Sequence, residues 1–271
     1  PSTCMEFLGI SFDTVTMTMS IPMAKILEIK EILQVWVHKD KASKKEVQSL
    51  IGKLQFASKC VRPGRVFIAR MLRHLRTLYA VNCNRPVSLP AYFIKDVSWW
   101  RRFMHIYNGV SLIPRHEWTQ PDAVFSTDSC LSGCGGILHI KHEYFHAKFP
   151  EFVVQQGLDI NCLELMTIVV ALKLWGRNLR GCRLQIYCDN KVSVSVVNTG
   201  RSRHEFLNDC LREIAFICAT FEIDIYCLHI NSADNRLSDL LSRWHLHSSY
   251  RKQFFDSVNV YMTEKVIDSD M

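Results

Sequence analysis

The sequence predicts an α/β fold for the second half of the chain, a mixed five-stranded sheet with flanking helices, preceded by an α-helical domain. Two observations predict this division. Apolar residues recur at helical spacing up to about residue 108, whereas short strand-like runs alternate with helices from residue 123 onward. Residues 21–108 contain 17 Lys and Arg against 5 Asp and Glu, a balance of +12, whereas residues 122–243 contain 12 against 14, a balance of −2.

Four helices are expected in the first half, at about residues 26–36, 47–61, 64–80 and 90–108, with a linker at 113–121. Ser43 and Glu46 are spaced as a capping box before the second helix. At 100° per residue, Arg65, Arg73 and Arg76 lie on one arc of the third helix, away from its apolar face. A basic stripe on a basic segment is typical of nucleic-acid binding, because each neutralised phosphate releases counterions. A merely solvated surface is the alternative.

The second half is expected to open with three strands and then to alternate helices with strands. The predicted strands span residues 123–130, 134–140, 143–149, 183–188 and 222–230. The predicted helices span residues 161–180, 191–198, 205–220 and 233–243. Gly133, Gly135 and Gly136 are expected to make the first turn. This order of elements gives a mixed sheet with helices packed over it.

Composition excludes several classes of protein. The 271 residues are 48% hydrophobic and 22% charged, which is typical of a globular chain and not of a disordered one. The most apolar segment, 163–176, includes two charged residues and is too short to span a bilayer, so no membrane role is expected. The 11 cysteines include no C-x-x-C pair, which indicates reduced thiols in an intracellular protein, cytoplasmic or nuclear. The first residue is Pro1, so we expect a piece of a longer chain.

Four carboxylates stand where the pattern makes carboxylates costly. Asp128 and Asp189 end apolar strands, where open α/β sheets gather their ligand groups. Glu164 shares a helical stripe with apolar residues, and Asp239 lies among leucines in the last helix. Each acid taken alone is better explained as a cap, a turn residue or an ion pair. If the four converge, hard oxygen ligands select two Mg²⁺ ions, with Mn²⁺ as a substitute.

A second constellation superficially suggests zinc. Cys130, Cys134, His139 and His142 have a spacing that a zinc site could use. In the strand interpretation the two cysteines flank a turn and the histidines alternate along strands, so a tetrahedral site is not expected.

Several of these motifs resemble the ribonuclease H family. The resemblance is carried, in order, by the segments Phe125–Leu138, Asn161–Met166, Ile186–Asn190 and Asn235–Arg243. It implies that Asp128, Glu164, Asp189 and Asp239 are catalytic and hold the metal ions. It also implies a mobile catalytic histidine ten residues before the last acid, which is His229. Nucleic-acid contacts are expected from one further set of residues: Ser129, Gly133, Gly135, Asn161, Asn190, Arg62, Arg65, Arg73 and Arg76.

Upstream segments resemble the end of the palm and the thumb of a retroelement reverse transcriptase. The resemblance rests on Met5–Ile10, Ser49–Leu54 and Val61–Val66, and other phrases look most like the DIRS and Ngaro group. It implies palm remnant strands at 1–20, a helical thumb or connection domain at 21–112, a ribonuclease H-like domain at 122–243 and a C-terminal extension at 244–271. No polymerase activity is expected, because Tyr187-Cys-Asp-Asn190 lacks the second aspartate of a polymerase box and lies in another context.

These expectations combine into one functional prediction. The chain is expected to hydrolyse the RNA strand of an RNA/DNA hybrid with divalent metal ions, and the remaining palm and fingers of a reverse transcriptase are its expected partner. A catalytically inactive, domesticated hybrid-binding module is the alternative. An integrase or transposase of the same fold is disfavoured, because that class lacks an acid at the position of Glu164.

Overall fold

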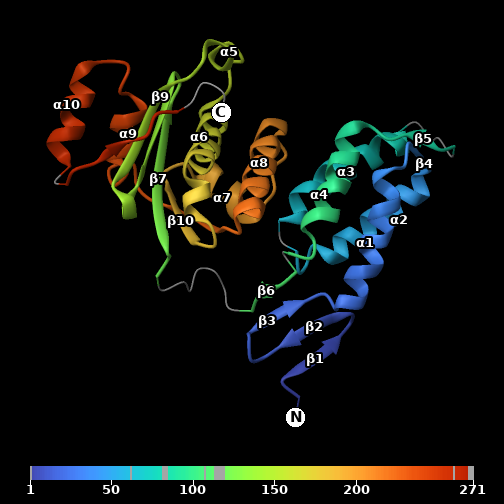
Figure 1. The fold of residues 1–271 in the computed structure, drawn as a ribbon. Coiled ribbons are helices and arrows are strands. Elements are labelled where there is room, and N and C mark those ends of the chain that lie inside the picture. The colour runs from blue at the N-terminus through green and yellow to red at the C-terminus, as the bar shows by residue number, and fades with distance from the viewer. Residues whose placement is uncertain are drawn as a thin grey trace. The chain divides into compact units, whose positions relative to one another are not determined.

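The computed structural model of the chain describes residues 2–61, 63–80, 85–106, 108–112, 120–258 and 260–267 (Figure 1). The chain divides into two compact units, Pro1–Glu117 and Trp118–Met271. Most of the predicted linker, residues 113–119, lies outside the described residues.

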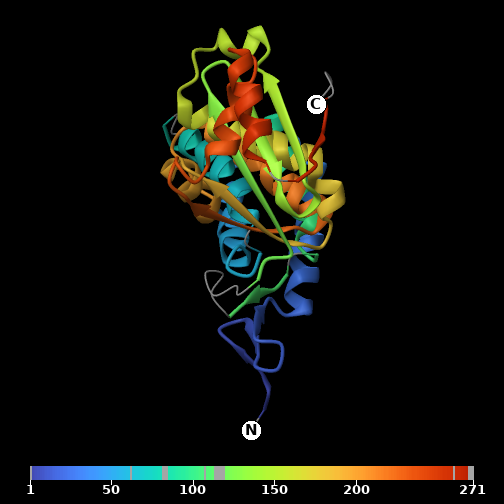
Figure 2. The same ribbon diagram turned by 90° about the vertical axis from the view of Figure 1, so that its left-hand side faces the viewer.

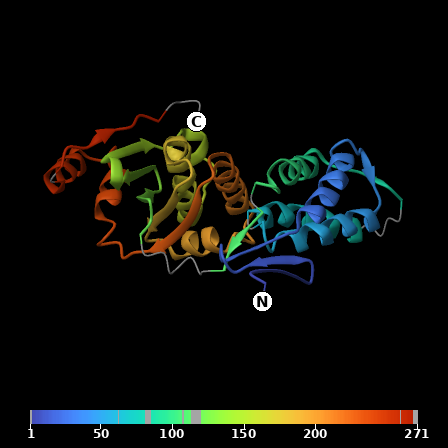
Figure 3. The same ribbon diagram turned by 60° about the horizontal axis from the view of Figure 1, so that its bottom comes forward.

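The first unit contains a four-stranded antiparallel sheet in the order β1-β2-β3-β6. Residues 8 and 9 connect the first two strands with positive φ angles of 50° and 73°, as a tight hairpin requires. In Figure 3 the green strand β6 lies beside the blue strands of the hairpin, with which it pairs through β3. The strands are β1 (Cys4–Phe7), β2 (Ile10–Asp13), β3 (Thr18–Ser20) and β6 (Val110–Ser111).

The remainder of the first unit is helical, as the spacing predicted. Its helices are α1 (Met23–Val37), α2 (Lys44–Ala57), α3 (Gly64–Ala80) and α4 (Ala91–Phe103), and β4 (Lys41–Ala42) pairs with β5 (Val87–Ser88). The predicted capping box of Ser43 and Glu46 is present at the start of α2. A Cβ at Gly64 would lie 2.2 Å from the buried ring of Trp100, so only glycine lets α3 begin against α4.

The second unit is built on a mixed sheet in the order β11-β10-β7-β8-β9-β12. β7, β8 and β9 are antiparallel neighbours, whereas β10 and β11 join in parallel. This arrangement confirms the predicted α/β fold class, a mixed sheet with flanking helices. The strands are β7 (Ala123–Cys130), β8 (Gly133–Leu138), β9 (Glu143–Lys148), β10 (Arg183–Cys188), β11 (Asp224–His229) and β12 (Thr263–Glu264).

The sheet has six strands and not the predicted five. The sixth, β12, comes from the segment that was expected to be a C-terminal extension, and it pairs in parallel with β9. Two residues are too few to show a strand period, so the pattern contains no signal for β12. Figure 2 shows helix α10 (Ser248–Ser257) in front of the sheet. Its Phe254 is fully buried in a cluster with Tyr144 and Leu241, so this segment contributes to the core.

Helices cover both faces of the sheet (Figure 1). α6 packs on β7 and β8 and is covered by α8, whereas α9 packs on the other face of the same strands. α6 ends at Trp175, five residues before the predicted end at Arg180, and a 3-10 turn from Gly176 to Leu179 follows it. The helices are α5 (Glu151–Val154), α6 (Ile160–Trp175), α7 (Lys191–Thr199), α8 (Glu205–Phe221) and α9 (Arg236–Ser242).

The prediction that Gly133, Gly135 and Gly136 form a turn is wrong. All three are buried residues of β8, and the turn lies at residues 131–132. A Cβ at Gly135 would lie 2.7 Å from the backbone carbon of Leu241, so this glycine lets α9 approach the strand. Close approach, and not a turn, is the physical reason for glycine here.

Two further expectations concern redox state and membranes. Among the described residues, every cysteine is a free thiol. Within the same residues, no helix combines the length and apolarity needed to cross a membrane.

Candidate functional site

Two of the four predicted acids meet because of the sheet order. β7 and β10 run in parallel as neighbours, with Tyr187 opposite Ser126 as their last pair. Asp128 follows two residues later in β7, and Asp189 comes directly after β10 ends at Cys188. Because the carboxyl ends of parallel strands lie at one edge, both carboxylates reach the same place.

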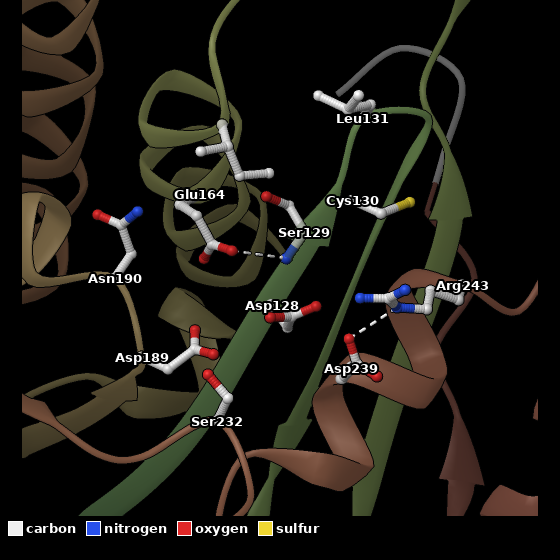
Figure 4. A pocket seen from close by; sticks show the side chains of 11 residues that line it. Asp128, Ser129, Cys130, Leu131, Glu164, Asp189, Asn190, Ser232, Asp239 and Arg243 are labelled. Atoms are coloured by element: carbon white, nitrogen blue, oxygen red, sulfur yellow. Dashed lines mark hydrogen bonds and ion pairs between the residues drawn. The ribbon is translucent and has the colours of Figure 1, made fainter.

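The other two acids come from the helices on either face. Glu164 lies in the second turn of α6, whose N-terminus is capped by Asp159 through the backbone N–H of Cys162 at 2.9 Å. Asp239 lies in α9. Figure 4 shows that all four carboxylates line one pocket. The structure therefore brings together the four acids that the sequence singled out.

Three buried polar side chains attach α9 to β7. Asn235 Nδ2 donates to the backbone oxygen of Thr127 at 2.9 Å, and Ser238 donates to the Ser126 hydroxyl at 2.9 Å. Ser242 Oγ donates to Asp128 Oδ2 at 2.7 Å. The helix residues are spaced i, i+3 and i+7, so they share one face. This face fixes the position of Asp239 beside β7.

Within the described residues, each acid except Asp189 has a polar side-chain or backbone partner in or beside the pocket. The backbone N–H of Ser129 donates to Glu164 Oε1 at 3.1 Å, and Ser242 holds one oxygen of Asp128. Arg243 Nε donates to Asp239 Oδ1 at 2.7 Å (Figure 4). These contacts orient the carboxylates with few donors, which leaves oxygen atoms available to a cation.

Burial and neighbouring charges make two of these carboxyls, Asp128 and Glu164, poor anions when no metal ion is bound. Asp128 is 6% exposed, and burial raises its pKa to about 7, with the charges of Asp189 and Asp239 acting in the same direction. Glu164 is 3% exposed, and burial raises its pKa to about 8, with Asp128 as the next cause. A cation bound between Asp128 and Glu164 would favour the ionised form of both carboxyls.

The donor set fits a hard divalent cation. Ligand atoms of Glu164, Cys188 and Asp189 all lie within 4.8 Å of one another. Burial raises the pKa of the Cys188 thiol far above its usual range, so the sulfur stays protonated and is no ligand for a hard ion. The carboxylate oxygens that remain are the ligands preferred by Mg²⁺ and Mn²⁺.

The structure places His229 beside the site and not in it. The ring is exposed at the end of β11, and its Nε2 donates to the backbone oxygen of Asp189 at 3.2 Å. His229 does not line the pocket among the described residues. A rotation of the exposed side chain is needed to bring the imidazole over the carboxylates.

The residues expected to contact nucleic acid are divided among three environments. Ser129 and Asn190 line the pocket, and Asn190 Nδ2 donates to Asn161 Oδ1 at 3.0 Å. Gly133 and Gly135 lie under α9 and the residues after it, so side chains of this chain occupy their open faces. Arg65, Arg73 and Arg76 are exposed on α3 of the first unit, and Arg62 lies outside the described residues.

The zinc alternative finds no support among the described residues, where the one group with metal-site spacing is Glu164, Cys188 and Asp189. Cys134 is buried, and His139 Nε2 lies 3.1 Å from the Ser126 hydroxyl.

Sequence reasoning missed Ser242 and Arg243. Both follow Asp239 on the same helix, at i+3 and i+4, which is the spacing of neighbours on one face. This spacing is visible in the sequence and could have identified both residues as neighbours of Asp239.

The chain is similar to several solved structures. No protein-family model and no curated protein matches the chain. LC11-RNase H1 in complex with an RNA/DNA hybrid is 16% identical with a TM-score of 0.38, over 44% of this chain and 93% of that one. The foamy viral protease-reverse transcriptase is similar in its complex with RNA/DNA hybrid (11% identity, TM-score 0.36, 91% of this chain and 53% of that one). In its complex with dsDNA the same viral protein is 13% identical with a TM-score of 0.30, over 84% of this chain and 45% of that one. The chain thus spans about half the length of the foamy viral protein.

The raised pKa values predict how stability depends on pH. A carboxyl whose folded pKa is raised stabilises the fold below its unfolded pKa, and this contribution is lost as pH rises through the folded pKa. We expect the contribution of Asp128 to disappear between about pH 4 and about pH 7 in metal-free protein. Asp128→Asn should therefore melt higher than wild type at pH 8 in EDTA, by on the order of a few degrees.

The measurement is thermal unfolding of both proteins at pH 5 and pH 8. Groups outside the pocket are the same in both proteins, so their contribution cancels in the difference between the two proteins. The difference should shrink at pH 5, and Mg²⁺ should raise the wild-type Tm at pH 8 much more than that of the variant. A difference that does not change with pH contradicts the prediction.

Proposed function

We propose that this chain is a metal-dependent endonuclease that hydrolyses the RNA strand of RNA/DNA hybrids, as the ribonuclease H part of a retroelement reverse transcriptase of DIRS or Ngaro type. The observation that supports it best is the convergence of Asp128, Glu164, Asp189 and Asp239 in one pocket at the carboxyl edge of the mixed sheet. The palm and fingers of the longer enzyme would be its partner.

The four acids would hold two Mg²⁺ ions, with Mn²⁺ as a substitute. Such a pair, when bound, supplies an activated water and stabilises the departing oxygen of a phosphodiester. The chain's own residues set the geometry for this. Ser242 fixes one oxygen of Asp128, and the Ser129 N–H fixes Oε1 of Glu164. The other Glu164 oxygen, Oε2, accepts from the Cys188 thiol at 3.8 Å, a weak contact that a metal ion would replace.

The direct test is incubation of the full chain with a hybrid labelled on the RNA strand, in Mg²⁺ and in EDTA. RNA/RNA and DNA/DNA duplexes of the same sequence are the controls. We expect RNA shortening only for the hybrid and only with the metal ion. Hybrid binding with no cleavage in Mg²⁺ or Mn²⁺ would instead support the inactive hybrid-binding module.

Salt dependence tests whether the basic first unit binds the backbone. Replacing Arg65, Arg73 and Arg76 together by Ala removes three exposed charges from α3. If all three contact phosphates, the slope of log affinity against log salt should fall in magnitude by roughly 2 to 3. Arg180→Ala, which removes a cation paired with Glu222 in the second unit, is the control. An unchanged slope in the triple variant would place the contacts elsewhere.

A further inference from the structure

Arg243 is the cationic residue of a pocket otherwise lined by four acids and by neutral side chains, within the described part of the chain. It caps the C-terminus of α9, and its side chain is 43% exposed. Its Nε donates to Asp239 Oδ1 at 2.7 Å, and its guanidinium also interacts with the Tyr250 side chain. The cation of the pocket thus occupies an oxygen of a proposed metal ligand.

The pair of Arg243 and Asp239 is a partly exposed i, i+4 ion pair. Such a pair contributes little to stability, so a second cation that binds Asp239 can displace the guanidinium. What distinguishes this pair from others on helix surfaces is that its carboxylate lies in the proposed metal site. A divalent ion bound to Asp239 would meet a guanidinium at hydrogen-bond distance from the same carboxylate, and the two cations repel each other.

The released guanidinium has an obvious alternative partner. Its planar donors match the oxygens of a phosphate, and a phosphodiester must enter this pocket if the proposed function holds. Since the side chain is only half-buried, it can change rotamer without opening the core.

We propose that Arg243 is a counter-cation that Asp239 keeps until a divalent ion arrives, after which Arg243 binds a phosphate of the nucleic acid. This inference rests on the proposed function for its second step only. Arg243 then couples the two ligands, because the metal ion frees the side chain that grips the substrate. By reciprocity, the metal ion and the hybrid must strengthen each other's binding by the same factor.

The first measurement needs no substrate and no activity. Mn²⁺ is titrated into the full chain and followed by electron paramagnetic resonance for wild type, Arg243→Ala and Arg243→Gln. Removing the competing cation should tighten Mn²⁺ binding on the order of 10-fold in both variants. Arg236→Ala removes the same charge from an exposed position of the same helix, away from the pocket, and should change binding little. Unchanged or weaker Mn²⁺ binding in the folded Arg243 variants would overturn the proposal.

The second measurement tests the phosphate contact. Affinity for the hybrid is measured in EDTA and in Ca²⁺, a hard cation that takes oxygen ligands, with the RNA checked for integrity by gel. Wild type should bind more tightly in Ca²⁺, and Arg243→Ala should lose most of this gain and about one unit of salt slope. An equal gain in wild type and Arg243→Ala would overturn the second step.

The two proposals can fail separately. Tighter Mn²⁺ binding by the Arg243 variants together with no cleavage by wild type would reject the nuclease and keep the counter-cation. Cleavage by wild type together with unchanged Mn²⁺ binding in the variants would do the opposite.

Discussion

Asp128→Asn is expected to abolish hybrid cleavage while the protein stays folded. The substitution removes a carboxylate oxygen of a proposed metal ligand at the end of the central strand β7. Metal-ion catalysis is worth several kcal/mol of transition-state stabilisation, so the loss should be about 10³ to 10⁴-fold. Asp189→Asn should be similarly inactive, because that carboxylate lines the same pocket.

The fold should survive because the buried environment already disfavours the charge. Burial and the neighbouring acids raise the pKa of Asp128 to about 7, and Ser242 can donate to the amide oxygen of an asparagine. Single-turnover cleavage and circular dichroism are measured on the same preparations. Asp256→Asn, an exposed acid on α10, is the matched control and should cleave normally. Retained cleavage in Asp128→Asn would remove this residue from the metal site.

His229→Ala is expected to slow cleavage by about 10²-fold or more, the usual range for general acid–base assistance. The imidazole lies at the end of β11 with Nε2 on the backbone oxygen of Asp189, so a side-chain rotation can bring it to the leaving oxygen. Because no metal ligand is lost, the dependence on Mg²⁺ concentration and the affinity for hybrid should remain close to wild type. Asp239→Asn should be harmed more.

The experiment is single-turnover cleavage against Mg²⁺ concentration at several values between pH 6 and pH 9. His38→Ala, an exposed histidine of the first unit, controls for loss of an imidazole as such. A wild-type rate for His229→Ala across this range would mean that the ring has only a structural role at the end of β11.

The sequence alone was sufficient to locate most helices and strands of the second unit and to single out the four acids that meet in the pocket. Strand 123–130 and the strand that starts at 183 carry period and end signals that depend on neighbouring residues only, and both were located within a residue. Asp128, Glu164, Asp189 and Asp239 stood out because a carboxylate among apolar residues is costly wherever the chain folds. The charge division between the halves is likewise a property of composition.

Tertiary structure alone decided how these acids are held together. Ser242 reaches Asp128, and Asn235 reaches Thr127, across more than one hundred residues of sequence, and such contacts exist only once α9 packs on β7. The same packing explains why β8 contains glycines in a strand where the pattern indicated a turn. Strand β12 forms because it pairs with the edge strand β9. Its two residues are too few to show an alternation of polar and apolar side chains in the sequence. The local sequence pattern determines which residues are available to form the pocket, and long-range packing determines where their side chains meet.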